Sequence, residues 1–468
     1  MFGALRERDF RLLFTGQTFS LIGSAITTVA LAFAVMEIVP QDHYAIDYGI
    51  VGAAGLVPLV AFLLIGGVWA DRLPRQWVML VSDVVRFACQ AVMAWLLLTH
   101  HATIWELVVL QFVRGSAEAF FRPAQTGLVP HTVSAERLQQ ANALRGLTDS
   151  LGVTLGAAVG GVMVAAIGPG WAIAIDSATY LVSAGFLWGL RNLSLPAAMP
   201  GSLAAAESGL TAGLAGEADP ASQGVSYDGS ASFLSDLRDG WQEFRSRTWL
   251  WVIVSEAAVF HLLIIAPFMV LGPYVAKHSL GGAAAWGAIL AAHGVGQVIG
   301  GVGGLRLRPA RPLLTCGWLT LLELPLFAFF ALGYRTPALV GAAVLCGISA
   351  ALVNVLWETT LQEQIPPAAL SRVSAFDWMG SLAFYPLGMI IAGPIAAVIG
   401  VTGSFTMASA ATLGSAALQI SLPDIRRVRR GRPPLPGETL GRPSLGDGAA
   451  ALTQTGLPVS SHSRYSAE

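Results

Sequence analysis

The chain has 468 residues, of which 54% are hydrophobic and only 12% are charged, with a formal net charge of −1 and a mean hydropathy of +0.63. Soluble domains carry roughly twice that charged fraction, about 25%. Too few polar residues remain to cover a water-facing surface, which excludes a soluble globular fold and makes lipid the expected solvent. The three cysteines each lie in an apolar run and indicate no disulfide framework.

Twelve apolar segments are each long enough to cross about 30 Å of hydrocarbon as a helix. The first is too long for the core of a signal peptide and lacks a clear cleavage site, so it is expected to remain as the first span. The predicted spans are 12–37, 47–69, 77–99, 104–128, 140–167, 169–190, 249–276, 283–304, 312–333, 337–361, 373–399 and 401–421.

The distribution of arginine predicts the orientation of these spans. If the N-terminus is cytoplasmic, the inside loops collect most of the arginines, whereas the outside loops hold only Lys277 and Arg335. This asymmetry obeys the positive-inside rule if the number of spans is even. Both termini are therefore expected in the cytoplasm.

The spans divide the chain into a first lobe at 1–191, a linker at 192–248, a second lobe at 249–421 and a tail at 422–468. The linker is first rich in Ala, Gly and Ser and then places Phe233, Leu237, Trp241 and Phe244 on one side of a helix. This pattern favours an amphipathic helix on the inner membrane surface, and a solvated helix is the alternative. The tail begins with arginines, ends in Pro, Gly and Ser, and is expected to be disordered.

Two sequence matches suggest that the two halves are duplicated. The stretch 65–73 (IGGVWADRL) aligns with 299–307 (IGGVGGLRL), each at the cytoplasmic end of the second helix of its half. In the fifth helix of each half, Gly156 and Gly161 align with Gly388 and Gly393. Parallel halves around an axis normal to the membrane place a substrate cavity at their interface, which favours a transporter over a receptor or a membrane-bound enzyme.

The loop between spans two and three carries the most specific motif. It reads Gly67-Val-Trp-Ala-Asp71-Arg72-Leu-Pro-Arg75. An acid there can face a helix N-terminus or pair with an arginine, and such contacts can latch one conformation. The motif resembles the signature loop Gly-x-x-x-Asp-Arg-x-x-Arg of the major facilitator superfamily. The resemblance implies an all-α membrane protein whose twelve transmembrane helices form two six-helix lobes.

Further motifs resemble a branch of exporters within that superfamily. Asp83 and Arg86 are similar to the family's Ser-Asp-x-x-Arg continuation, which extends the predicted latch. Residues 114–144 resemble macrolide- and enterobactin-exporter-like members, and residues 357–363 and 372–382 resemble actinobacterial ones. Span five is similar to the antiporter motif of exporters, with Ala157 in place of its proline. Its small residues, expected to pack closely against a neighbouring helix, are Gly152, Gly156, Gly160 and Gly161.

Charged residues inside predicted spans are costly, at about 2.5–3.5 kcal/mol each, and therefore mark functional candidates. The coupling candidates are Arg114, Glu118, Asp149, Asp176, Glu256 and Asp377, and the spans also contain Glu323 and Glu358. Arg114 and Glu118 lie four residues apart on one helical face and could form a structural ion pair. The resemblance instead implies that the span-four arginine takes part in coupling.

The remaining candidates fall into two groups by their expected depth. Asp83, Arg86, Asp149 and Asp377 are expected in the cytoplasmic half, where they would form a gate network. Asp176 and Glu256 are expected deeper, where a carboxyl group could take up and release a proton. Helix capping and pairing with a carbonyl group are the alternative roles.

One position departs from the resembled exporters. They often carry an acid in span one after a Ser-x-x-Gly pattern, but this chain has Ser24 there, and serine cannot carry a proton at physiological pH. A proton coupling would then depend on another acid. No phosphate-binding loop is present, and His100 and His101 are adjacent and cannot share a helical face, so neither ATP drive nor a metal site is expected. No cofactor is predicted, and the proton gradient is the expected energy source.

The sequence therefore predicts a transporter, not an enzyme, that exports a drug-like or siderophore-like small molecule in exchange for protons from the plasma (inner) membrane of a bacterium. Cavity candidates from spans one, four, seven and ten are Phe19, Glu118, His261, Asn354 and Trp357. A substrate and the lipid bilayer are the expected partners, without nucleic acid, and the monomer is expected to function alone. The alternatives are an uptake permease of the same fold and a non-transporting membrane sensor.

The latch hypothesis predicts that Asp71→Asn reduces transport, because the neutral amide loses the attraction to a helix N-terminus or an arginine. Transport by the variant, compared with the unchanged protein at equal membrane abundance, tests this. Normal transport would remove the signature-loop acid from the mechanism.

Overall fold

The computed structural model describes residues 3–190 and 241–431, and within these ranges the regular structure is helical, without a strand. The first lobe consists of α1 (Arg8–Ile38), α2 (Tyr44–Arg72), α3 (Arg75–Leu98), α4 (Ile104–Leu128), α5 (Leu138–Ile167) and α6 (Pro169–Trp188). Three short 3₁₀ turns, η1 (Gly3–Arg6), η2 (Val129–His131) and η3 (Ala135–Arg137), lie outside these helices.

The helices of the second lobe are more often interrupted. Its seventh span runs from α9 (Thr248–Phe260) through a π-helical turn η4 (His261–Ile265), α10 (Ala266–Val275) and a second π-helical turn η5 (Ala276–Leu280). The following elements are α11 (Ala283–Gly304), α12 (Pro312–Thr320), α13 (Leu324–Ala331), α14 (Thr336–Gln364), α15 (Pro367–Leu382) and α16 (Tyr385–Ser421). Together α12 and α13 form the ninth span, and α15 with the first part of α16 forms the eleventh.

Twelve crossings follow from these elements. Ten helical segments are long and apolar enough to span a membrane, and one of them, Phe376–Ser421, contains two crossings because the chain turns at Gly400. The φ of 74° at Gly400 is a conformation that glycine adopts without strain. Helix α4 adds the twelfth crossing. It is not among the ten apolar segments because it carries Glu106, Arg114, Glu118 and Arg122. The predicted twelve-helix fold is confirmed.

Glycines allow the helices of the first lobe to pack closely. A Cβ atom on Gly156 would contact the Ala25 side chain and the Ile22 carbonyl of α1, and one on Gly160 would lie 2.9 Å from the Ile26 Cα. Gly152 faces the Leu21 side chain in the same way. This face of α5 therefore packs directly on the backbone of α1, as small residues four apart permit.

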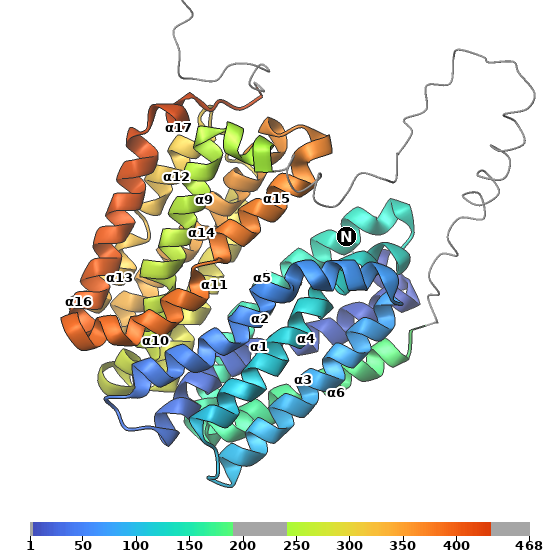
Figure 1. Cartoon of the computed structure of the whole chain (residues 1–468), viewed down its shortest axis with the longest axis vertical. Helices are drawn as coiled ribbons and strands as arrows, with labels where there is room; N and C mark the ends of the chain where they lie inside the picture. Colours follow the sequence, from blue (N-terminus) through green and yellow to red (C-terminus); the bar gives the residue numbers. More distant parts are fainter. Residues whose placement is uncertain (1–2, 191–240, 432–468) are drawn as a thin grey trace, which may run out of the picture.

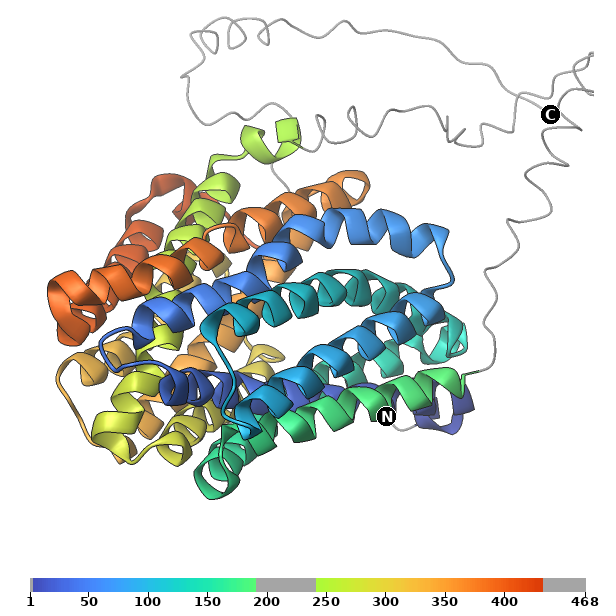
Figure 2. The same cartoon turned by 60° about the horizontal axis from the view of Figure 1, so that its bottom comes forward.

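The two lobes contact each other near one end of the molecule, through α2 against α16 and α5 against α11. At Gly161 a Cβ atom would lie 2.8 Å from the Cα of Gly287, and at Gly393 one would lie 2.6 Å from the Ile46 amide nitrogen. Figure 2 shows α2 running beside the orange first part of α16. These contacts are between backbones, with no side chain in between.

Aromatic and polar groups continue this contact beyond the helix ends. The Tyr44 ring stacks on the Tyr274 ring at 5.9 Å, and the Gln41 amide donates to the Tyr274 hydroxyl at 3.1 Å. The Lys277 amine donates to the Met36 carbonyl at 3.4 Å. Figure 1 shows the lobes diverging from here towards the end that carries α15, α17 (Pro423–Arg427) and the N-terminus. In the predicted orientation, the lobes are closed outside and apart inside.

At the two ends of the second lobe, the structure corrects the predicted start of the disordered tail and describes part of the predicted amphipathic helix. The tail was expected to be disordered from residue 422, but residues 423–431 are ordered: Ile425 in α17 is buried, and the Arg430 amide donates to the Ala310 carbonyl at 3.2 Å. Of the predicted amphipathic helix, residues 241–246 are helical, and Phe244 packs on Phe376 at 6.0 Å. Phe233, Leu237 and the remaining tail lie outside the described residues.

The first span is anchored at its start by a surface carboxylate. Glu7 accepts hydrogen bonds from the Ser134 amide at 3.1 Å and from Arg137 at 3.2 Å. The bond from the Ser134 backbone, more than the charge of Arg137, holds the pKa of Glu7 below its ordinary value. The contact ties the N-terminus to the loop between α4 and α5.

The backbone contact between the lobes predicts the effect of Gly161→Val. Its side chain would collide with the Ala283 carbonyl and Gly287, so the lobes must separate at this end. Spin labels on cysteines at Asp42 and Ser279 should report a longer inter-label distance, because both residues are exposed near the contact. The matched control is Gly185→Val on α6, where a Cβ atom meets nothing within 4 Å. Equal distances in both variants would contradict the prediction.

Candidate functional site

A buried ion cluster joins three helices of the first lobe. Arg86 on α3 is only 3% exposed and forms ion pairs with Asp83 on its own helix and with Glu118 on α4, the latter at 2.6 Å. Arg122 also reaches Glu118, at 2.9 Å, and the Ser183 hydroxyl of α6 donates to Asp83 at 2.7 Å. The Arg86 guanidinium therefore has a carboxylate on two sides, which offsets much of the cost of burying it.

The pair between Arg114 and Glu118, one of the two alternatives for these residues, is not formed. Arg114 instead donates to the Gln111 amide oxygen at 2.7 Å, one turn earlier on α4, while Glu118 binds Arg86 and Arg122. Both residues lie on one helical face, but Glu118 is paired with Arg86 from the neighbouring helix α3. The physical reason is that a spacing of four residues brings two side chains near each other without fixing their partners.

Asp176 lies deeper in the same lobe and is fully buried. It accepts hydrogen bonds from the Thr27 hydroxyl at 2.7 Å and from the Gln90 amide at 2.6 Å. One turn further along α6, the Tyr180 hydroxyl lies 2.9 Å from the Ser24 hydroxyl. Ser24, which replaces the acid of related exporters, thus contacts the helix that carries Asp176.

A pocket of about 360 Å³ opens beside these groups. We call it the first-lobe pocket, and its polar lining includes Ser20, Ser24, Arg86, Glu118, Arg122 and Arg145. Three arginines and one carboxylate line it, so it is rich in positive charge.

Several predicted residues are placed only in part. Gly67, Asp71 and Arg72 lie in the last turns of α2 and Asp149 lies in α5, but their side chains are outside the described ones. Arg75 begins α3 and donates to the Gly127 carbonyl at 2.7 Å, which ties α3 to the end of α4. The latch prediction therefore stays a prediction at its acid.

The second lobe contains a larger pocket, of about 470 Å³. We call it the second-lobe pocket, and it surrounds Glu256, His261, Glu323, Asn354, Trp357 and Asp377. The sequence therefore identified residues from α9, η4, α14 and α15 that meet in one cavity. Phe19 does not join them: it lies on α1 with 49% of its surface exposed and lines neither pocket.

Neutral groups hold the carboxylates of the second-lobe pocket. Glu256 accepts hydrogen bonds from the Ser415 hydroxyl and, at 3.1 Å, from the Gln419 amide. The Trp357 indole donates to Asp377 at 3.0 Å, and the Ser349 hydroxyl donates to Glu323 at 2.9 Å. These partners come from helices far apart in the sequence.

His261 stands where span seven departs from a regular α-helix. Its ring nitrogen Nδ1 lies 2.8 Å from the Ala257 carbonyl, and its ring centre lies 5.7 Å from that of Tyr385 on α16. It is the first residue of the π-helical turn η4. Such turns are rare and occur often at functional sites.

The neutral polar partners of the candidate acids were not predicted from the sequence. Thr27, Gln90, Tyr180, Ser415 and Gln419 were not named, although each bonds a candidate residue or Ser24. A usable signal existed for Gln90, because it lies four residues after Arg86 on one face of an apolar helix.

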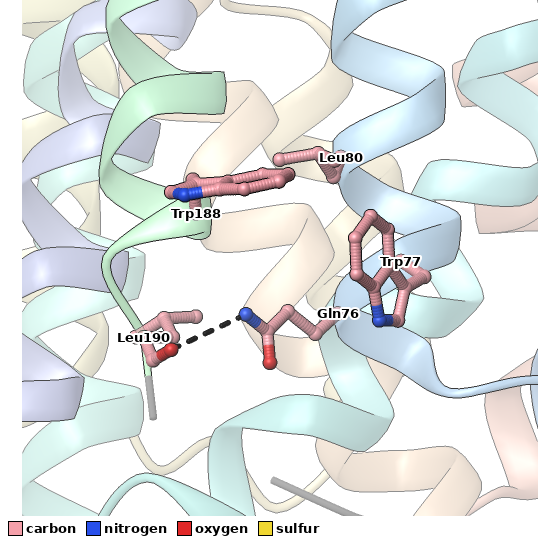
Figure 3. Close-up of a pocket in the computed structure, with 5 residues that line it drawn as sticks. All are labelled: Gln76, Trp77, Leu80, Trp188 and Leu190. Carbon is pink, nitrogen blue, oxygen red and sulfur yellow. Dashed lines mark hydrogen bonds between the residues drawn. The ribbon is translucent and has the colours of Figure 1, made fainter. Parts of the chain in front are cut away.

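A third pocket, of about 360 Å³, lies at the ends of α3 and α6 (Figure 3). The Gln76 amide donates to the Leu187 and Leu190 carbonyls at 2.9 and 3.4 Å, and the Trp77 and Trp188 rings meet edge to face at 5.7 Å. Exposed tryptophans at the ends of spans are typical of a membrane interface, so we do not assign this pocket to transport. Within the described ranges, no three potential metal ligands come together.

The sequence is similar to those of known proteins. The family model described as Major Facilitator Superfamily matches residues 13–381. "Multidrug efflux pump Tap" of Mycolicibacterium fortuitum is 25% identical over 426 residues, which cover 87% of this chain and 93% of Tap. "Macrolide efflux protein A" of Streptococcus pyogenes is 28% identical over 129 residues, 28% of this chain and 31% of that protein.

Solved structures share the fold at low identity. The nucleoside transporter NupG superposes with a TM-score of 0.58 at 14% identity, covering 89% of this chain and 96% of NupG. A D-xylose–proton symporter gives a TM-score of 0.62 at 11% identity, covering 92% and 99% of the two chains. At these identities the likeness concerns the fold alone.

The buried ion cluster predicts that Asp83→Asn destabilises the first lobe. The change leaves Arg86 with a single buried carboxylate partner, and breaking a buried pair costs about 3–5 kcal/mol. The free energy of unfolding, measured by denaturant titration in detergent micelles, should decrease by up to that amount. Glu7→Gln removes an acid from a more exposed pair and serves as the control with a smaller expected loss. A variant as stable as the unchanged protein would show that the cluster contributes little.

Proposed function

The chain belongs to the Major Facilitator Superfamily, and we propose that it exports a drug-like or siderophore-like small molecule in exchange for protons. It is a multi-pass membrane transporter and not an enzyme. The observation that carries the direction of transport is the match with Tap, because that protein is named an efflux pump and aligns over nearly its whole length. The proposed location is the plasma (inner) membrane of a bacterium, with both termini in the cytoplasm and the monomer as the working unit.

The arrangement of the lobes supports alternating access. The lobes touch through α2, α16, α5 and α11 near one end and diverge towards the other (Figure 1). With cytoplasmic termini, this is the state that loads substrate from inside the cell. Backbone contacts at Gly161 and Gly393 hold closed the end where the lobes touch, and among the described side chains no ion pair between the lobes must be broken before the lobes rock apart.

The first lobe supplies the proposed proton carrier. Asp176 is fully buried and bonded by Thr27 and Gln90, which are neutral and can accommodate either charge state of the carboxyl group. The Ser24 hydroxyl lines the first-lobe pocket and contacts Tyr180, one turn from Asp176. We propose that protons reach Asp176 along this side, so that Ser24 assists transfer without carrying the charge itself.

The proton gradient is the proposed energy source. In cells lacking their main exporters, expression of the protein should lower accumulation of at least one compound in a panel of lipophilic drugs and siderophores, and a protonophore should abolish the effect. Substrate-driven accumulation would identify an uptake permease instead. No movement in either direction, with the protein present in the membrane, would favour a non-transporting sensor.

The assignment of Asp176 predicts a separation of two activities in Asp176→Asn. The variant should lose proton-driven efflux but retain substrate exchange in proteoliposomes with substrate on both sides, because exchange needs no net proton movement. The control is Glu136→Gln, which changes an exposed acid in η3. If efflux persists in Asp176→Asn, another acid carries the proton, whereas the loss of exchange as well would indicate a structural role.

A further inference from the structure

The second-lobe pocket has the size and walls of a ligand site that is complete within one lobe. Its volume of about 470 Å³ lies within the range of about 300–1,000 Å³ that is usual for small-molecule sites. Apolar side chains such as Ile253, Phe260 and Val353 form much of its lining. Trp378, which also lines the pocket, is 56% exposed.

The acidic and basic side chains that line this pocket are four acids and the rings of His261 and His293. Four carboxyl groups line it, those of Glu256, Glu323, Glu358 and Asp377, and no lysine or arginine is among the described residues around it. Their partners are hydroxyl, amide and indole groups, and none of the four forms an ion pair with a basic side chain in the part of the chain that the structure describes. A cavity lined by one sign of charge with apolar walls concentrates ions of the opposite sign.

The first-lobe pocket shows that this is not a general feature of the molecule. There, Glu118 is paired with Arg86 and Arg122, so the carboxylate that lines that pocket already has basic partners within the protein. In the second lobe, no lysine or arginine lines the described pocket, and two aromatic side chains, Trp357 and Trp378, line it together with Asp377. Tryptophan faces attract cations, most strongly where water is excluded.

From the cavity, its unpaired carboxyl groups and its aromatic walls, we infer that the second-lobe pocket binds a lipophilic monocation, with Glu256 and Asp377 as its counter-charges. The apolar walls take the body of the ligand, and Trp357 and Trp378 flank its charge. This inference rests on the proposed function, since it names the substrate class of the transporter. It also places the ligand within one lobe, because every lining residue belongs to the second lobe.

Two probes of opposite charge and nearly equal shape test the inference. Radiolabelled tetraphenylphosphonium should bind the purified full-length protein in detergent, and tetraphenylborate should neither bind comparably nor displace it. Glu256→Gln should raise the Kd of tetraphenylphosphonium by about tenfold, which corresponds to about 1.4 kcal/mol. Glu136→Gln, on an exposed turn of the other lobe, should leave the Kd unchanged.

The possible outcomes separate this inference from the proposed export. If Glu256→Gln does not yield a folded protein by size-exclusion chromatography, Asp377→Asn replaces it with the same expected loss. Equal binding of both probes, or a Kd that neither substitution changes, overturns the inference. Selective binding of the cation without efflux in cells would leave the inference standing and would overturn export as the function.

Discussion

Arg86 is almost completely buried in a segment that crosses the membrane, and this single guanidinium determines much of the first lobe. A buried arginine needs carboxylates close by, and it takes them from α3 and α4. Ser183 of α6 then bonds Asp83, and the faces of Phe121 and Tyr180 cover the guanidinium at 3.9 and 4.7 Å from its central carbon. Three helices are therefore held in one register around a charge that lipid could not accommodate.

The two lobes share a fold, but their pockets are lined by different charged residues. In the first lobe, Glu118 is paired with Arg86 and Arg122, so this pocket acid has its counter-charges within the protein. The second lobe leaves its carboxyl groups with neutral donors around an open cavity. An ancestral duplication would make the halves alike in backbone, and this difference in charge then divides the work between them. In the function proposed above, the first half handles the proton and the second half recognises the ligand.

The sequence predicted the fold well and the site unevenly, for physical reasons. Length and hydropathy together predicted every span, the more highly charged α4 included, because a membrane helix must be long enough to cross the bilayer and predominantly apolar. Periodicity placed Arg114 and Glu118 on one face but could not reveal Arg86 as the partner, since contacts between helices depend on their packing. His261, Asn354 and Trp357 were found because they are polar or aromatic in apolar helices, whereas Phe19 was not distinguished from a surface residue. The ordered residues 423–431 were missed because their contacts come from Ala310 and Glu363, distant in sequence.

The contact of Gly161 with Gly287 has a consequence for how such a protein can vary. Glycine has the smallest side chain, so every substitution at these two positions, or at Gly393, adds bulk where two backbones already touch. Single mutations here can only push the lobes apart and never draw them closer. Substitutions at this contact therefore change the spacing of the lobes in one direction only, towards separation. Only compensating changes elsewhere in the protein could bring the lobes back together.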